Sequence, residues 1–212
     1  MAGAAVVALT LVGCATGPRP RLVDDTTNTP LVNENAQGLV DALSTASRSP
    51  FTVAYDIVTK FGGQKTKALV TGDATHGTAI VIASIKYVYL PDGQSFTCDT
   101  GSNTCGVGID ETRISDRQLT SRFYKDSVIS RIRQDARTAA GEITFAIQDV
   151  AGTSALCLGV PVIDGNGAIQ TKSYCAYSTF GMLASMETAD LSVTATSVAS
   201  SADLSYFEGL PL

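Results

Sequence analysis

The amino-acid sequence predicts an α+β domain in which one curved antiparallel β-sheet, a half-barrel, packs over helices. Three observations support this fold class: segments of alternating apolar and polar residues flank a central segment with a helical period, hairpin-type turn residues separate them, and an amphipathic segment precedes them all. The 212 residues suffice for one compact domain of ordinary size. We therefore expect one large sheet with its helices on one face.

Composition and charge exclude several classes of function. Hydrophobic residues make up 44% of the chain and charged residues 17%, which is a globular composition. The formal net charge of -5 argues against a nucleic-acid partner, which would require an excess of Lys and Arg. The single histidine, His76, excludes metal sites built from two or three imidazoles, and no motif typical of zinc binding is present. We expect no metal and no cofactor.

The first residues, MAGAAVVALTLVGC, are typical of an export signal, because their apolar run at residues 2–12 is too short to span a bilayer as a helix. Residues 11–14 resemble the lipobox of bacterial lipoproteins. The resemblance implies a diacylglyceryl group on Cys14, whose two acyl chains would anchor the protein to the outer, periplasmic face of the cell membrane. The alternative is an ordinary signal or a core helix with an incidental cysteine.

The residues after Cys14 are polar and interrupted by proline, which predicts a flexible tether. We therefore divide the chain into a signal peptide at residues 1–13, a lipidated N terminus and tether at residues 14–32, and a single domain at residues 33–212.

The four remaining cysteines permit three disulfide pairings in an oxidising compartment. Proximity favours Cys98 with Cys105 across a short loop, and Cys157 with Cys175 across a hairpin that turns at DGNG. A redox-active dithiol is the alternative, but neither pair has the CxxC spacing that lowers a thiol pKa.

The domain begins with a helix predicted within residues 33–48. Asn33 is the candidate N-cap, and Ser49-Pro50 is the candidate stop. The apolar residues at helical spacing are Leu39, Val40, Leu43 and Ala46.

A half-buried strand is predicted at residues 51–61, followed by strands at 67–73, 78–84 and 85–90 with turns at GG, THG and PDG. The first of these strands places five apolar residues on one face: Phe51, Val53, Tyr55, Ile57 and Phe61.

The period then changes to about 3.6, which predicts a second helix between Asp110 and Ala140. Ser115 and Gln118 match a capping box, and Gly141 is the candidate stop. The apolar stripe of this helix comprises Leu119, Phe123, Val128, Ile132 and Ala136.

Alternation resumes after Gly141 in EITFAIQ, continues through LCLGVPVID and AIQTKSYCAYS, and ends in GMLASME and DLSVTATSV. We expect four more strands here. In the first segment, Ile143, Phe145 and Ile147 line one face.

The lipobox, the N-terminal helix, the strand FTVAYDI, the hairpin YVYLPDGQSFTCD and the C-terminal segment ending in FEGLP together resemble the LolA-like half-barrel lipoproteins of the actinobacterial LppX and LprG type. The resemblance covers residues 33–212. It implies a LolA-like fold with an apolar cavity between sheet and helices, which carries acyl chains in lipid or glycolipid transport across the cell envelope. It also implies no catalytic residue. An envelope transporter is a candidate partner, through the surface of the domain.

The apolar face of the strands supplies the candidate lipid-binding residues, each of which is alternatively plain core. They are Phe51, Val53, Tyr55, Ile57, Ile80, Ile82, Phe123, Ile143, Phe145, Ile147 and Met182.

The second helical segment is basic, with seven basic and three acidic residues between Arg113 and Arg137. Such a face could meet anionic headgroups of a membrane or of a bound lipid. The alternative is a solvated face with pairs such as Arg122 with Asp126 and Arg131 with Asp135.

No nucleophile elbow, paired catalytic carboxylates or phosphate-binding glycine motif occurs in the sequence, so we do not expect an enzyme. Two hypotheses stay open: a lipid-carrying envelope lipoprotein, and a tethered accessory module with a filled core that binds another protein.

Overall fold

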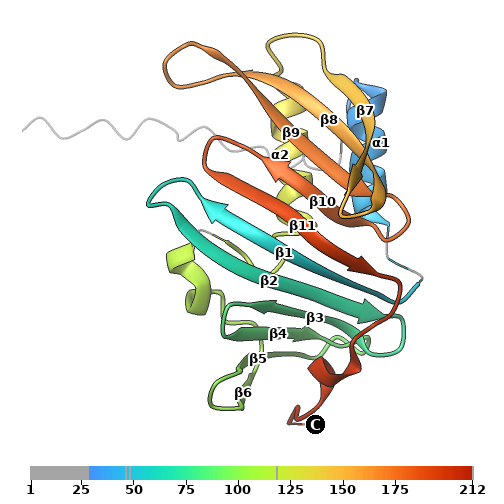
Figure 1. Ribbon diagram of the computed structural model, residues 1–212, viewed down its shortest axis with the longest axis vertical. Coiled ribbons are helices and arrows are strands. Elements are labelled where there is room, and N and C mark those ends of the chain that lie inside the picture. Colours follow the sequence, from blue (N-terminus) through green and yellow to red (C-terminus); the bar gives the residue numbers. More distant parts are fainter. Residues whose placement is uncertain (1–28, 46, 48, 118, 212) are drawn as a thin grey trace, which may run out of the picture.

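The protein is described by a computed structural model that covers residues 29–45, 47, 49–117 and 119–211. These residues form one sheet of eleven antiparallel strands, with two α-helices on one of its faces and two short 3-10 helices (Figure 1). The expected α+β half-barrel is confirmed. The predicted signal peptide, Cys14 and most of the predicted tether lie outside the described residues.

The strand order places the first and last strands side by side at the centre of the sheet: β6-β5-β4-β3-β2-β1-β11-β10-β9-β8-β7. Each half is therefore an up-and-down meander, and the helical segment between β6 and β7 joins the two outer edges (Figure 1). The strands are β1 (Phe51–Thr59), β2 (Gln64–Asp73), β3 (Gly77–Ile82), β4 (Ile85–Tyr89), β5 (Ser95–Asp99), β6 (Thr104–Val107), β7 (Thr144–Val150), β8 (Thr153–Ile163), β9 (Ile169–Tyr177), β10 (Met182–Glu187) and β11 (Leu191–Ala199).

Five strands follow residue 141 where we expected four. GMLASME and DLSVTATSV form separate strands, β10 and β11, because the chain turns at Thr188–Asp190, where the Thr188 backbone N–H donates to the Leu191 carbonyl (2.9 Å).

The first helix, α1 (Glu34–Ser44), has the predicted start. The Asn33 side chain accepts a hydrogen bond from the Ala36 backbone N–H (3.0 Å), as an N-cap does. Leu39, Val40 and Leu43 are buried on one stripe. The helix ends before the predicted stop at Ser49-Pro50, and Ala46 lies outside the described residues.

The second helical segment is not one helix between Asp110 and Ala140, as the period predicted. It consists of the 3-10 helix η2 (Glu111–Arg117), a turn region, and the helix α2 (Asp126–Arg137). The Glu111 carboxylate accepts a hydrogen bond from the Ser121 backbone N–H (2.9 Å), which folds the chain back on itself. Phe123 and its neighbour Tyr124 are both buried in the turn region that precedes α2.

The predicted limits of that helix were also wrong. Ser115 lies inside η2 and donates to the Thr112 carbonyl (3.0 Å), while Gln118 lies outside the described residues. Lys125 precedes α2 without capping it by a side-chain hydrogen bond, and Thr138, not Gly141, follows its end.

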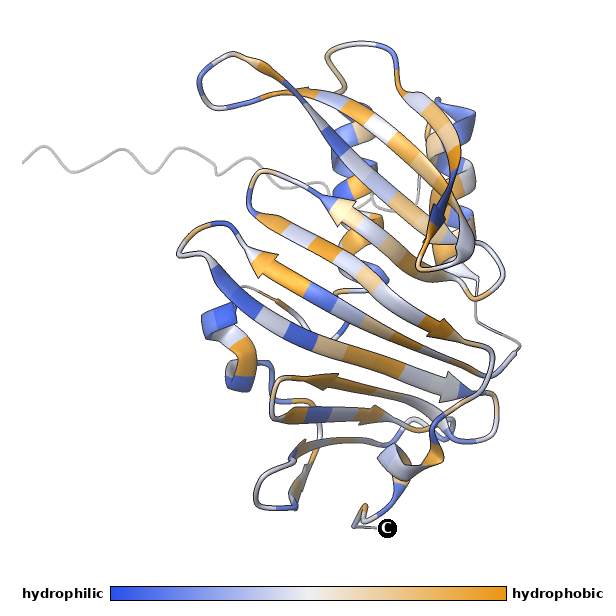
Figure 2. Ribbon diagram, in the orientation of Figure 1, coloured by the Kyte–Doolittle hydropathy of each residue, from blue (hydrophilic) through white to orange (hydrophobic). Residues whose placement is uncertain are grey.

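The inner face of the sheet, which faces α2, is identified by Tyr174 of β9, whose hydroxyl donates to Asp135 of α2. Directly opposed residues share a face, so the register places Leu158, Met186 and Ile57 on the inner face too. Apolar and polar residues alternate along the strands, as Figure 2 shows. Phe61 does not belong to this face: it follows β1 in a turn and is exposed, because the strand ends at Thr59.

The C-terminal segment packs on the outer face of β3, β4 and β5. There Ala79, Val88 and Phe96 form a second apolar cluster, against which Phe207 of the 3-10 helix η3 (Leu204–Phe207) packs.

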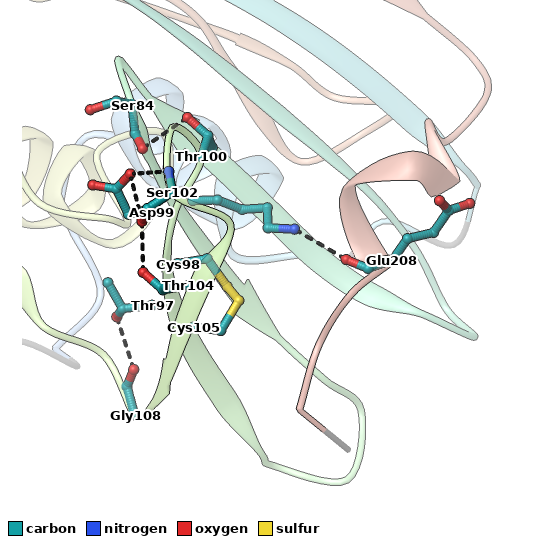
Figure 3. The surroundings of a disulfide bond; sticks show 11 residues. Ser84, Thr97, Cys98, Asp99, Thr100, Ser102, Thr104, Cys105, Gly108 and Glu208 are labelled. Carbon is teal, nitrogen blue, oxygen red and sulfur yellow. Dashed lines mark hydrogen bonds between the residues drawn. A yellow bond between two sulfur atoms is a disulfide. The ribbon is translucent and has the colours of Figure 1, made fainter.

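Both predicted disulfides are present. Cys98 and Cys105 join β5 to β6 (Figure 3), and Cys157 and Cys175 join β8 to β9 at directly opposed positions.

Candidate functional site

Nine of the eleven candidate lipid-binding residues are buried in one continuous core. These are Phe51, Val53, Tyr55, Ile57, Ile80, Ile82, Phe123, Ile143 and Met182. Phe145 and Ile147, by contrast, are 44% and 66% exposed. The structure therefore brings most of the candidate residues together, but most of them pack against other side chains of the protein in the core.

An aromatic cluster occupies the space between β1 and the segment before α2. The rings of Tyr55 and Phe123 meet edge to face at 5.3 Å, and those of Phe123 and Tyr124 at 5.8 Å. The Tyr55 hydroxyl donates to the Leu183 carbonyl (2.7 Å), and burial raises the pKa of this phenol well above its ordinary value. This part of the half-barrel interior is filled.

Next to this cluster, a pocket of about 380 Å³ opens at one end of the half-barrel, and we call it the mouth pocket. It lies among the start of β1, the β2–β3 and β9–β10 turns, the end of β4 and the residues before α2. Its lining is Ser47, Phe51, Asp73, Ala74, Gly77, Thr78, Tyr89, Leu90, Pro91, Tyr124, Lys125, Phe180, Gly181 and Met182. Of the candidate lipid-binding residues, Phe51 and Met182 are at this site.

Two glycines bring the walls of the mouth pocket together. Gly77 has φ +90, and a Cβ at this position would lie 2.0 Å from the Tyr89 carbonyl oxygen. Gly181 has φ +64, and its Cβ would lie 2.2 Å from the Thr45 carbonyl oxygen at the end of α1. Only glycine combines these backbone angles with such close approaches. Sequence reasoning missed both positions, although Gly77 belongs to a turn signal that it recognised.

The rim of the mouth pocket contains ionisable groups on two sides. Asp73 accepts hydrogen bonds from the backbone N–H groups of Thr75 (2.8 Å) and His76 (2.6 Å), and the His76 ring Nδ1 lies 2.9 Å from its other oxygen. The His76 backbone bond is the largest of the causes that lower the pKa of Asp73. On the other side, Lys125 is half-buried and its Nζ donates to the Thr45 carbonyl (3.3 Å).

A larger cavity, of about 610 Å³, lies at the C-terminal end of α2. It is bordered by residues 29–33 and by the segment that enters β7, and Ile143 is its only candidate lipid-binding residue. Arg133 and Arg137 both donate to the Thr29 carbonyl here, and Leu31 is buried in the core. The end of the predicted tether thus packs against the domain.

Most basic residues of the second helical segment contact the protein itself. Arg122 pairs with Asp126 (2.8 Å), as predicted, and its guanidinium lies 4.5 Å above the Tyr89 ring. Arg131 pairs with Asp190 (2.7 Å) and not with Asp135, which the i,i+4 rule suggested.

Asp135 instead turns toward the inner face of the sheet. It is buried, and it accepts hydrogen bonds from Lys172 (2.7 Å) and from the Tyr174 hydroxyl. The partner that the helical spacing suggested was wrong because Asp135 lies on the buried stripe of α2.

Phe145 and Ile147 lie on the edge strand β7. The register pairs Phe145 with Leu158 and Ile147 with Leu156, so both side chains continue the inner face of the sheet. They are exposed because β7 is at the end of the strand order, and all its residues except Val150 are exposed. The prediction that they share one face is confirmed, and the side chains on that face are exposed at the edge of the sheet.

Within the described ranges, no group of three His, Cys, Asp or Glu side chains is placed to hold a metal ion. Over the same ranges, no helix combines the length and apolarity needed to cross a membrane.

No protein-family profile matches the chain, and neither does any curated protein. Among solved structures the chain is similar to the crystal structure of MucB, with 15% identity and a TM-score of 0.45 over 81% of this chain and 60% of that chain. It is also similar to LprF from Mycobacterium bovis, with 10% identity and a TM-score of 0.37 over 77% of this chain and 92% of that chain. A putative outer membrane lipoprotein-sorting protein domain from Vibrio parahaemolyticus has 8% identity and a TM-score of 0.38 over 82% and 95%.

Proposed function

We propose that this domain binds the acyl chain of a lipid or glycolipid in the mouth pocket, without catalysis, and that it acts in lipid transport in the cell envelope. In this proposal the diacylglyceryl group on Cys14, the last residue of the lipobox-like segment, supplies the anchor. The observation that carries it is the mouth pocket itself, which is lined by Phe51, Tyr124, Phe180 and Met182 and opens at the end of the half-barrel.

The size and lining of the mouth pocket suit one slender apolar group. Its volume of about 380 Å³ lies within the usual range of small-molecule sites, about 300–1,000 Å³. Each methylene that leaves water there contributes about 0.8 kcal/mol. The packed rings of Tyr55, Phe123 and Tyr124 adjoin the mouth pocket through Tyr124, so we propose that a chain enters the mouth pocket and stops there, with a single chain per domain.

A blocking substitution tests this proposal. Ala74 is exposed in the β2–β3 turn and lines the mouth pocket, so Ala74→Trp would place an indole in its opening without disturbing the core. Ala189 is exposed in the β10–β11 turn away from this pocket, so Ala189→Trp is the matched control. Both are made in the full chain with Cys14→Ser, so that no attached acyl chain competes.

Binding is measured by titration with a fluorescent single-chain fatty acid. We expect saturable binding that Ala74→Trp weakens about tenfold or more, a loss of about 1.4 kcal/mol, while Ala189→Trp leaves it unchanged. Equal affinities for the two variants, or no saturable binding to the parent chain, would contradict the proposal.

The edge strand β7 supports a second candidate function, a module that binds another protein. An exposed edge with apolar side chains is a site where a partner adds a strand, and Phe145 and Ile147 supply such side chains. An Ile147→Lys variant that loses an envelope partner while keeping fatty-acid binding would favour this candidate.

A further inference from the structure

The charges around the mouth pocket differ between its two sides. Asp73 and Lys125 are the ionisable acid and base among its described lining residues. The Asp73 carboxylate is directed at donors of its own turn, the backbone N–H groups of Thr75 and His76 and the His76 ring. The side of the mouth pocket at Lys125 is therefore the one open to an incoming anion.

Lys125 has no carboxylate partner among the described residues. The adjacent Asp126 pairs with Arg122 (2.8 Å), and the Lys125 Nζ donates a hydrogen bond to the Thr45 carbonyl, at 3.3 Å. Burial lowers the pKa of Lys125, since the protein has removed part of the water around its ammonium group. A bound anion would replace that water.

The cation and the apolar lining are neighbours in the chain and in space. Tyr124 precedes Lys125 directly, and its carbonyl accepts a hydrogen bond from the Leu183 backbone N–H (3.2 Å), next to Met182 at the start of β10. Phe180 of the β9–β10 turn lines the same pocket. A ligand with an apolar chain against these three side chains would thus have its head group beside Lys125.

Building on the proposed function, we propose that the ligand is a single-chain amphiphile with an anionic head group, a carboxylate or a phosphate monoester, and that Lys125 binds this head group. Charge complementarity between an ammonium without a carboxylate partner and the head group selects this class over alcohols and neutral esters.

The test compares two ligands of equal chain length, dodecanoate and dodecanol, by calorimetric titration of the Cys14→Ser chain. The variant Lys125→Met removes the charge and keeps the length of the side chain, and Lys125→Arg restores the charge. Lys65→Met is the matched control, because Lys65 is exposed at the start of β2, the end of that strand away from the mouth pocket. Thermal unfolding establishes that each variant is folded.

We expect the parent chain to prefer dodecanoate by about tenfold or more, the range of a hydrogen bond to a charged group. Lys125→Met should abolish the preference by weakening dodecanoate alone, whereas Lys125→Arg and Lys65→Met should retain it. Equal binding of both ligands to the parent chain, or a preserved preference in Lys125→Met, would overturn this inference and leave the proposed function standing.

Two further outcomes of the titrations show whether the proposed function or only the proposed ligand class is wrong. Binding of neither ligand would overturn the proposed function and this inference with it. If inorganic phosphate binds as tightly as dodecyl phosphate, the site recognises an anion without a chain. That result would overturn the proposal that the ligand is an amphiphile.

Discussion

Replacing Phe123 with alanine tests the filled interior on which the proposed single-chain site depends. Phe123 is 2% exposed, and its ring meets the rings of Tyr55 at 5.3 Å and Tyr124 at 5.8 Å. Burial of such a side chain contributes about 1.5–3 kcal/mol, and each edge-to-face contact adds about 0.5–1.5 kcal/mol. With the cavity that remains, we expect Phe123→Ala to lower the free energy of unfolding by about 3–5 kcal/mol.

Urea denaturation followed by circular dichroism measures this loss. Phe123→Leu is the control, because leucine keeps most of the apolar volume, and it should cost about 1–1.5 kcal/mol. A loss below about 1 kcal/mol for the alanine variant, with an unchanged dependence on urea, would refute the assignment of Phe123 to a packed core.

The same substitution has a consequence for binding. Tyr124 lines the mouth pocket and its ring contacts the Phe123 ring at 5.8 Å, so the alanine variant removes a buried side chain next to the pocket lining. In the parent chain we expect affinity to stop rising once the fatty acid fills the mouth pocket. In Phe123→Ala it should continue to rise with chain length, and identical chain-length profiles would contradict the single-chain geometry.

Two further predictions concern the scaffold. The Cys157–Cys175 disulfide closes a loop of 18 residues, so its removal should lower the free energy of unfolding, measured by urea denaturation, by about 3 kcal/mol. The disulfide between β5 and β6 closes a loop of 7 residues, so its removal should lower it by about 2 kcal/mol, and a larger loss for the shorter loop would contradict the chain-entropy argument. Arg131 lowers the pKa of Asp190 to about 2, so this pair stabilises the fold above the ordinary aspartate pKa, and the contribution is lost as the pH falls from about 4 to 2. Arg131→Met should therefore destabilise the chain more at pH 6 than at pH 2.5, and an equal effect at both would contradict the pairing.

Local signals in the sequence were sufficient for much of the fold. The Asn33 cap, the alternation in residues 51–59 and the two disulfides each depend on residues that are neighbours in the chain or on adjacent strands. These features appeared where the sequence placed them because short-range geometry determines them.

The features that the sequence did not predict depend on contacts between residues far apart in the chain. The second helix is divided because Glu111 binds the Ser121 backbone ten residues away, a contact that periodicity does not register. The alternation of Phe145 and Ile147 shows which residues share a face, but whether a helix covers that face depends on where β7 lies in the sheet.

The mouth pocket could not be predicted from the sequence, because it also depends on contacts between segments that are distant in the chain. Its walls meet because Gly77 approaches the Tyr89 carbonyl and Gly181 approaches the end of α1, at Thr45. A turn glycine is apparent in the sequence, but the segment against which it packs is known only from the fold.

The most direct test of the central claim is to locate a bound acyl chain. The Cys14→Ser chain is labelled with a photoreactive fatty acid, digested and analysed by mass spectrometry. We predict saturable labelling within residues 73–78, 89–91 and 180–182, the segments that contain most of the mouth-pocket lining, and its loss in Ala74→Trp but not in Ala189→Trp. Labelling confined to β7, or labelling that does not saturate, would contradict an acyl-binding site in the mouth pocket.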